Sequence, residues 1–156
     1  MSGHHRTDVP LLLVVLAAIV GCDSFALDPA LFGEPLTLAA SAEASDGVEF
    51  GICRIEGPLT FSAVTNSVAT GTGIVHDSTR FGSSVGESLR NRTDTIPVVL
   101  RVVAGGQVRL ELQYSGADAP VPPVLIGDAT AEGYGGSWTC GNPPRITVTG
   151  TWVLGR

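Results

Sequence analysis

The stretch TIPVVLRVVAGGQVRLELQYS, residues 95–115, decides the fold class of this chain. After the pair Gly105-Gly106, the run VRLELQY alternates apolar and polar residues, and apolar residues also recur at every second position before the pair. A period of two is the pattern of a strand with one buried face. The stretch therefore predicts two antiparallel strands joined by a short glycine turn.

Two registers compete for this hairpin. A two-residue turn would place Arg101 opposite Leu110 and mix the two faces. A three-residue loop over 105–107 pairs Val102 with Leu110 instead. The same loop brings Arg101 opposite Glu111, so one face stays apolar and unlike charges meet across the strands. We therefore predict the three-residue loop, with a glycine in the left-handed conformation.

Two more strands close the chain. ITVTGTWVLG, residues 146–155, places its large apolar residues and Gly150 on one face and its threonines on the other. EGYGGSWTC, residues 132–140, places Tyr134, Gly136 and Trp138 on a single face. Glycine beside aromatic residues on one strand face indicates a bend, or a ring packed closely against the backbone.

Shorter segments predict further strands near residues 36–40, 48–55, 59–64 and 68–76, and no convincing long helix appears. Seven or eight short strands favour an all-β fold, either a small antiparallel barrel or meander or a β-sandwich. Residues 35–156 are long enough to form one such domain. The chain contains no lysine and has a formal net charge of −6. Such an acidic chain without a basic cluster is a poor nucleic-acid partner.

The N-terminus carries the uncharged run VPLLLVVLAAIV, residues 9–20. It is too short to span a bilayer, which needs about 20 residues of helix, and is typical of the apolar centre of a secretory signal peptide. The motif Ile19-Val20-Gly21-Cys22 that follows resembles the lipobox of bacterial lipoproteins.

The lipobox resemblance implies a location and an anchor. Residues 1–21 would be removed, Cys22 would carry diacylglycerol and fatty acyl chains such as palmitate, and residues 22–34 would tether the domain to a membrane on the periplasmic side. Asp23 favours retention at the inner membrane. The alternative is an ordinary signal peptide in which Cys22 is a structural thiol.

If Cys22 is lipidated, Cys53 and Cys140 remain as a pair in an exported chain, where a disulfide is the expected state. Cys53 is out of phase with the apolar residues before it. Either a bulge lies near Gly51, or the disulfide lies at the rim of the domain.

Catalytic and metal-binding motifs are missing from the sequence: we find no GxSxG, P-loop or HExxH pattern. His76 is followed by Asp77, but neighbours on a strand point to opposite faces, so we expect His76 to cap a strand beside a polar loop. We predict no catalytic residues, no metal and no cofactor.

Two segments have the character of recognition loops. Residues 77–94 are polar and predict a long loop, with one helical turn from Ser84 to Glu87, and their arginines Arg80, Arg90 and Arg92 would suit an anionic ligand or partner. The alternative is a solvated loop.

The second segment, APVPPVLIG over 119–127, contains three prolines that favour extended geometry. Its apolar residues Val121, Val124 and Leu125 must either pack on the sheet or contact a partner.

These observations favour a lipid-anchored, non-enzymatic accessory or structural subunit of the cell envelope that docks on a protein partner. A carrier that holds a small apolar ligand inside a barrel is the alternative. A hydrolase would need His76 as its base.

Overall fold

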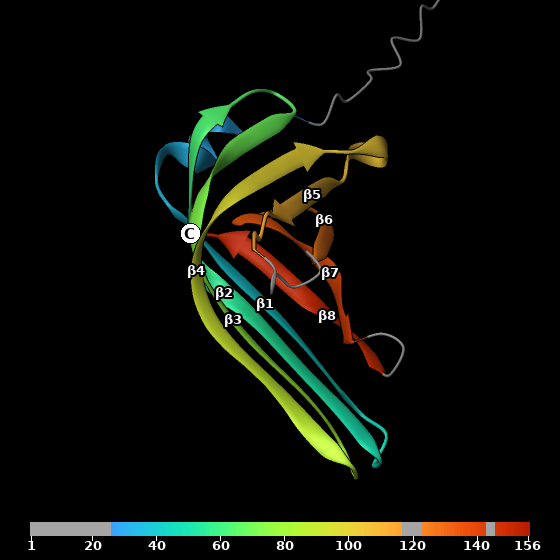
Figure 1. The fold of residues 1–156 in the computed structure, drawn as a ribbon. Helices are drawn as coiled ribbons and strands as arrows, with labels where there is room; N and C mark the ends of the chain where they lie inside the picture. Colours follow the sequence, from blue (N-terminus) through green and yellow to red (C-terminus); the bar gives the residue numbers. More distant parts are fainter. Residues whose placement is uncertain (1–25, 117–122, 143–145) are drawn as a thin grey trace, which may run out of the picture.

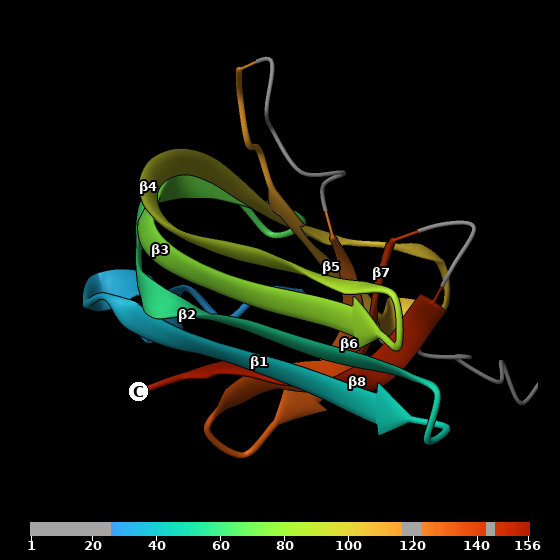
Figure 2. The same cartoon turned by 60° about the horizontal axis from the view of Figure 1, so that its bottom comes forward.

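Eight antiparallel strands form a closed barrel in the computed structural model, which describes residues 26–116, 123–142 and 146–156 (Figures 1 and 2). Each strand pairs with the next along the chain, and β8 returns to pair with β1. The strands are β1 (Leu36–Ser45), β2 (Glu49–Val64), β3 (Val68–Ser83), β4 (Gly86–Val102), β5 (Val108–Leu112), β6 (Val124–Thr130), β7 (Gly133–Asn142) and β8 (Ile146–Gly155). The all-β prediction and its barrel alternative are confirmed.

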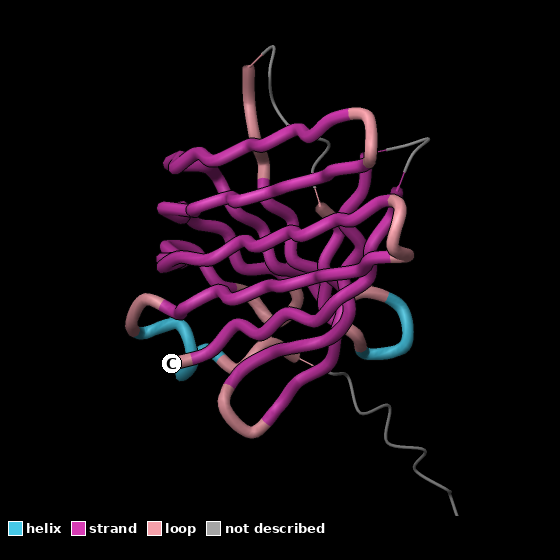
Figure 3. Tube along the Cα trace, turned by 90° about the horizontal axis from the view of Figure 1, so that it is seen from below, coloured by secondary structure: helices cyan, strands magenta, loops and turns pink. Residues whose placement is uncertain are grey.

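Helix is confined to two short 3-10 segments in the described part of the chain, η1 (Pro29–Gly33) and η2 (Ala104–Gly106). Figure 3 shows these two segments in cyan against a wall made of strands. Across the described residues, no helix is long and apolar enough to cross a membrane. The predicted signal peptide and the lipobox cysteine Cys22 lie outside the described residues.

The strands are unequal, because the middle of the sheet is much longer than predicted. β2, β3 and β4 have 16, 16 and 17 residues, whereas β5 has 5. The segments 48–55 and 59–64 join into the single strand β2. The interior side of these strands carries the leucine-rich core at one end and polar residues at the other.

The predicted loop over 77–94 is wrong. Residues 77–83 belong to β3 and residues 86–94 to β4, and their pairing runs without interruption from Val68 opposite Arg101 to Ser83 opposite Gly86. Only Ser84 and Val85 form the turn, so there is no helical turn at Ser84. The segment forms strands despite its polarity because its inward-facing polar side chains pair with one another.

The predicted register of the β4–β5 hairpin is also wrong, by two residues. Val102 lies opposite Val108, and Arg101 lies opposite Arg109. The connection is longer because Gly105 and Gly106 both have positive φ, 82° and 77°, and extend the turn into η2. A shift of two keeps the apolar face inside.

The unlike charges of this hairpin still meet, although not directly across the strands. Arg101 Nε reaches Glu111 Oε1 diagonally at 3.1 Å. The charge pairing that favoured the shorter loop is therefore also available in the observed register.

The N-terminal segment closes one end of the barrel, which we call the plugged end. The backbone N–H of Leu27 donates to the carbonyl of Asn66 in the β2–β3 turn. Phe32 of η1 is buried and packs edge-on against Phe61 at a centroid distance of 5.1 Å, and stacks on Tyr134 at 6.2 Å. Apolar residues of the predicted tether are thus part of the core.

The opposite end is the hairpin end. It carries the tips of the β1–β2 and β3–β4 hairpins, which point to the bottom of Figure 1, together with the ends of β5 and β7 and the starts of β6 and β8. The blue segment η1 lies at the top of the same view. Every connection joins adjacent antiparallel strands, so successive connections alternate between the two ends of the barrel. Each end therefore has its own set of loops.

The indole of Trp138 passes over a glycine of the neighbouring strand β8 and hydrogen-bonds to the next strand, β1. Trp138 of β7 lies opposite Gly150 of β8, and its indole Nε1 donates to the carbonyl of Ser41 on β1 at 3.1 Å. A Cβ at Gly150 would lie 1.9 Å from that carbonyl oxygen. The strand backbones approach too closely at this point for any side chain.

Trp152 repeats the arrangement in the other direction. It lies opposite Gly136 of β7, and its Nε1 donates to the carbonyl of Ile126 on β6 at 3.1 Å. A Cβ at Gly136 would lie 2.3 Å from that oxygen. The predicted close packing of glycine and aromatic residues is confirmed, and it joins four consecutive strands of the barrel.

Cys53 and Cys140 form the predicted disulfide, which joins β2 to β7 across the two strands between them. Cys53 is fully buried and shares the inward face with Ile55, whereas Cys140 is half-buried near the hairpin end. The register is continuous at Gly51, so the bulge, one of the two alternatives for the phase of Cys53, is wrong. Cys53 points into the core, and the residues that face outward are Phe50 and Ile52.

Substitution of Gly150 by alanine should destabilise the barrel. Because the new methyl group would collide with backbone atoms of β1, we expect the free energy of unfolding to fall by about 1–3 kcal/mol or more. Gly33→Ala is the control, since a Cβ there meets nothing within 4 Å, and it should change stability by less than about 0.5 kcal/mol. Urea denaturation followed by tryptophan fluorescence measures both, and equal midpoints would contradict the packing described.

Removal of the disulfide should lower stability through the unfolded state. The two cysteines are 87 positions apart, and the chain-entropy estimate for so large a loop is about 4.5 kcal/mol. The double variant Cys53→Ala/Cys140→Ala should therefore unfold at much lower urea concentration than the native chain. A reductant should destabilise the native chain and leave the variant unchanged; a native chain insensitive to reductant would argue against the bond.

Candidate functional site

Strand alternation separates the three arginines that the sequence singled out. Arg80 faces outward, where its Nη2 donates to Glu87 Oε2 at 2.9 Å and its guanidinium lies 5.2 Å from the centre of the Phe50 ring. Arg90 and Arg92 occupy the inward positions of β4. Only two of the three arginines therefore lie on the same face of the sheet.

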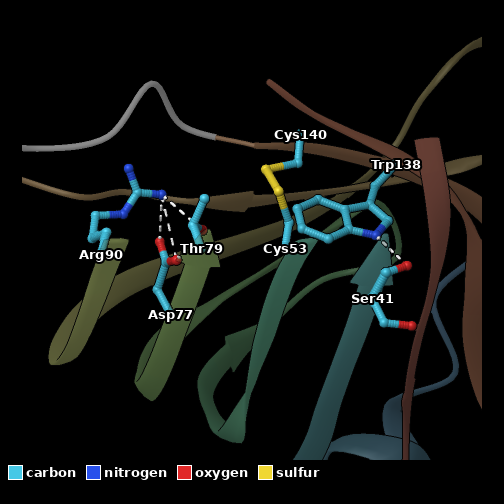
Figure 4. Close-up of a disulfide and its surroundings, with 7 residues drawn as sticks. All are labelled: Ser41, Cys53, Asp77, Thr79, Arg90, Trp138 and Cys140. Carbon is cyan, nitrogen blue, oxygen red and sulfur yellow. Dashed lines mark hydrogen bonds and ion pairs between the residues drawn. A yellow bond between two sulfur atoms is a disulfide. The ribbon is translucent and has the colours of Figure 1, made fainter. Parts of the chain in front are cut away.

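Arg90 pairs with a buried carboxylate on β3 (Figure 4). Asp77 is only 1% exposed, and its Oδ2 accepts a hydrogen bond from Arg90 Nη2 at 3.0 Å. Thr79 donates its hydroxyl to Asp77 Oδ1 at 2.8 Å and accepts from Arg90 Nη2 at 3.2 Å. A buried charge is tolerated when it is paired and hydrogen-bonded, and both conditions are met here.

Arg92 makes a second ion pair on the same face. It pairs with Asp94 two residues further along β4, and its guanidinium lies 5.8 Å from the centre of the Tyr114 ring. The hydrogen bond from Arg92 lowers the pKa of the Asp94 carboxyl. Tyr114 follows β5 in the chain and is half-buried. It places an aromatic ring beside the two ion pairs.

Six residues make up this inward polar cluster. They come from β3, from β4 and from the segment after β5: Asp77, Thr79, Arg90, Arg92, Asp94 and Tyr114. Burial raises the pKa of the Tyr114 hydroxyl far above its ordinary value, and the carboxylate of Asp77 raises it further. The hydroxyl therefore stays protonated and can donate a hydrogen bond at any physiological pH.

Two donors of the cluster have no partner in the part of the chain that the structure describes. The Tyr114 hydroxyl and Arg90 Nε are both buried and make no hydrogen bond. More than nine in ten buried polar groups in folded proteins are hydrogen-bonded, so each exception requires an explanation. Four such donors occur among the described residues: Arg101 Nε and Arg109 Nε lie 3.1 and 3.3 Å from Glu111 Oε1, and the other two belong to this cluster.

An apolar surface adjoins the cluster on its β2 side. Thr79 lies opposite Cys53, so the cluster sits directly beside the disulfide (Figure 4). Phe81, the next inward residue of β3, packs over Gly51, where a Cβ would be 2.8 Å from the ring. The same point is 3.0 Å from Val148. Charged and apolar groups thus meet at the hairpin end.

The proline-rich segment places its predicted residues differently. Val121 lies outside the described residues. Val124 is 42% exposed on β6, whereas Leu125 is fully buried in the core and cannot contact a partner. Val124 also borders a shallow hollow of about 340 Å³ on the outer face of β6 and β7, which ends at Trp138 and Thr139.

His76 lies on the outer face of β3. It lies within β3 rather than at a strand end, so the predicted capping role is wrong. Its Nδ1 lies 3.0 Å from Thr93 Oγ1 on the outer face, whereas Asp77 points inward, as predicted for strand neighbours. Among the described residues there is also no group of three or more His, Cys, Asp or Glu side chains that could hold a metal ion.

Four members of the cluster were missed from sequence: Asp77, Thr79, Asp94 and Tyr114. A usable signal was present. The inward positions of β3 continue from Ala69 and Val75 to Asp77, and those of β4 run back from Ile96 to Arg90. Extending the period of two through the polar segment would have placed the cluster inside the barrel.

The chain matches no protein-family model, and it shows significant similarity to no curated protein and no solved structure. A barrel fold by itself does not specify an activity. The function must therefore be argued from the geometry and chemistry of the site.

The buried tyrosines should make stability fall at alkaline pH. Burial raises the pKa of both Tyr114 and Tyr134 in the folded state, so above the ordinary tyrosine value of about 10 only the unfolded chain loses these protons. The contribution of these two tyrosines to the free energy of unfolding should be constant below pH 10 and should decrease above it. Urea midpoints at pH 8 and pH 11 measure the loss, which should be smaller in Tyr114→Phe; an equal loss would contradict the burial of this hydroxyl.

Proposed function

We propose that this protein is a lipid-anchored component of the cell envelope that works by binding a partner rather than by catalysis. In this proposal acyl chains on Cys22 hold it on the periplasmic face of a membrane, with Asp23 favouring the inner one. The lipobox resemblance of residues 19–22 supports the anchor. The arrangement of the barrel supports an orientation in which the plugged end lies near the membrane and the hairpin end lies away from it.

The position of the tether is the observation that carries the proposal. Ala26, the first described residue, precedes Leu27, which is bonded into the plugged end. Four residues from Cys22 to Ala26 span at most about 14 Å, so an anchor at Cys22 would keep the plugged end close to the bilayer. A strand of 16 residues is about 50 Å long, so the hairpin end can reach well away from the surface.

The hairpin end has the surface expected of a docking site. Val48 and Val85, at the tips of the two hairpins, are 65% and 87% exposed, and Leu89 on β4 is 67% exposed. Large apolar side chains grouped on a protruding surface favour contact with another protein. Catalysis is not favoured, because Asp77 and Thr79 are engaged with Arg90 and His76 lies on the opposite face.

A small-ligand carrier is the second candidate. An eight-stranded barrel has room for its own side chains or for one small ligand. Fully buried leucines occupy the plugged half, including Leu36, Leu59 and Leu154, so a ligand would bind at the hairpin end. The unpartnered donors of the inward polar cluster favour that location.

Site-specific crosslinking tests the docking proposal. A photoreactive amino acid at Val85 should give a reproducible adduct with one envelope protein in intact membranes. The same residue at Glu132, which is exposed in the β6–β7 turn at the plugged end, is the matched control and should not give that adduct. Adducts that are identical at both positions, or absent at Val85, would refute docking through the hairpin end.

The anchor is tested in the same membranes. Cys22→Ala should release the protein from the membrane fraction, because no acyl chain can then be attached. Mass spectrometry of the native chain should find diacylglycerol on Cys22 at a new N-terminus. A variant that still sediments with membranes would contradict the lipid anchor.

A further inference from the structure

We infer that the inward polar cluster binds the carboxylate of a ligand whose apolar part rests beside Phe81 and the disulfide. The inference rests on the proposed function in one respect: it names the chemistry that the hairpin end would recognise. It starts from the two donors of this cluster that are buried and make no hydrogen bond with any described residue, the Tyr114 hydroxyl and Arg90 Nε.

The chemistry of the free donors selects an acceptor. Arg90 Nε can only donate, and the Tyr114 hydroxyl stays protonated because burial raises its pKa. The carboxylates of the cluster already have donors: Asp77 accepts from Arg90 and Thr79, and Asp94 pairs with Arg92. What the cluster lacks is therefore an oxygen acceptor, which a ligand can supply.

The charges of the cluster favour a single negative charge on that ligand. Two arginines and two aspartates balance, so a carboxylate would bring the site to one net negative charge. A phosphate group carries about −1.5 to −2 at neutral pH and would lie close to both aspartates. Since like charges repel strongly where solvent is scarce, the carboxylate is the better fit.

The Arg90 side chain is partly exposed, although its Nε atom is buried. Its side chain is 39% exposed while its partner Asp77 is 1% exposed, so Arg90 forms the boundary between the buried pair and solvent. Arg90 contacts Asp77 and Thr79 through Nη2, as Figure 4 shows. A carboxylate that approaches from the solvent side can therefore add to the existing ion pair without breaking it.

The neighbouring residues supply an apolar surface for the rest of the ligand. Phe81 follows Thr79 at the next inward position of β3, and the Cys53–Cys140 bond lies beside Thr79 on β2. An aromatic or aliphatic acid would place its carboxylate at Arg90 and its hydrocarbon against this surface. A free acid and the C-terminal residue of a peptide share this chemistry.

Titration calorimetry of the full chain in detergent tests the inference. Benzoate represents a free acid and N-acetylphenylalanine represents a peptide end; benzamide and phenyl phosphate are the neutral and dianionic controls. At least one of the two carboxylates should bind. Benzamide and phenyl phosphate should bind at least ten times more weakly. No carboxylate binding, equal binding of benzamide, or tighter binding of phenyl phosphate would each overturn the inference.

Four variants locate the site. Arg90→Gln should weaken carboxylate binding at least tenfold, and Tyr114→Phe about three- to tenfold, because each removes a donor. Asp77→Asn should tighten binding several-fold, since it removes a repelling charge. Arg80→Gln, an outward arginine paired with Glu87, is the matched control and should bind as the native chain does. Near-ultraviolet circular dichroism checks that each variant is folded.

The variants are expected to change the affinity for carboxylates in opposite directions, so the test remains decisive if one variant fails to fold. If Arg90→Gln does not fold, Asp77→Asn and Tyr114→Phe still predict changes in opposite directions, and equal losses in both would refute the site. A Val85 adduct without carboxylate binding would remove this inference and leave the docking proposal. Carboxylate binding without a Val85 adduct would support this inference and remove the docking proposal.

Discussion

The β1–β8 ladder closes the barrel, and this closure sets the surroundings of every other strand. Six residue pairs, from Thr37 opposite Gly155 to Ala42 opposite Gly150, join the first strand to the last. Closure joins the first strand to the last and gives every strand an inside and an outside, although β4 pairs with β5 only over Val98–Val102. Each inward position must then be filled by a side chain that the interior can accept. Near Gly150 the strands come so close that only a glycine fits.

The unequal lengths of the strands explain how a polar cluster can lie on the inside. β2, β3 and β4 extend far beyond the five residues of β5, so their distal halves face a shorter opposite wall. Asp77 is buried there, but its partner Arg90 reaches solvent. Burying an ion pair completely costs desolvation of both charges, and partial exposure of the arginine reduces that cost. The same polar residues in the leucine-rich plugged half would lack this access to water.

The sequence is sufficient for much of this fold because β-strands expose their pattern directly. The faces of β7 and β8 follow from the alternation around Trp138 and Trp152, and the disulfide follows from the predicted export signal and the even number of remaining cysteines. Register and turn length are harder. Two consecutive glycines at 105–106 permit several turns, and matching Arg101 to Glu111 does not distinguish them, because arginine also reaches a diagonal neighbour.

The segment 77–94 shows why the candidate site could be predicted only in part. Polarity indicates a loop when side chains are considered one at a time, and the arginines then appear to be free surface groups. In the folded chain inward polar residues face one another across the β3–β4 ladder, with Asp77 opposite Arg92 and Thr79 opposite Arg90. Such pairing is a property of two strands together, and it becomes visible only once their register is known.

The disulfide gives the hairpin end a fixed geometry that the strands alone do not provide. Cys53 ties the wall that bears Asp77 and Thr79 to β7, which is not its hydrogen-bonded neighbour. Trp138, two residues before Cys140, binds β7 further to the carbonyl of Ser41 on β1. A site held by a covalent bond and an indole hydrogen bond loses less conformational entropy when a ligand binds. The rigid part of the barrel therefore extends to the end at which we place recognition, and the same oxidising compartment that permits the disulfide is the one in which the lipid anchor would place the protein.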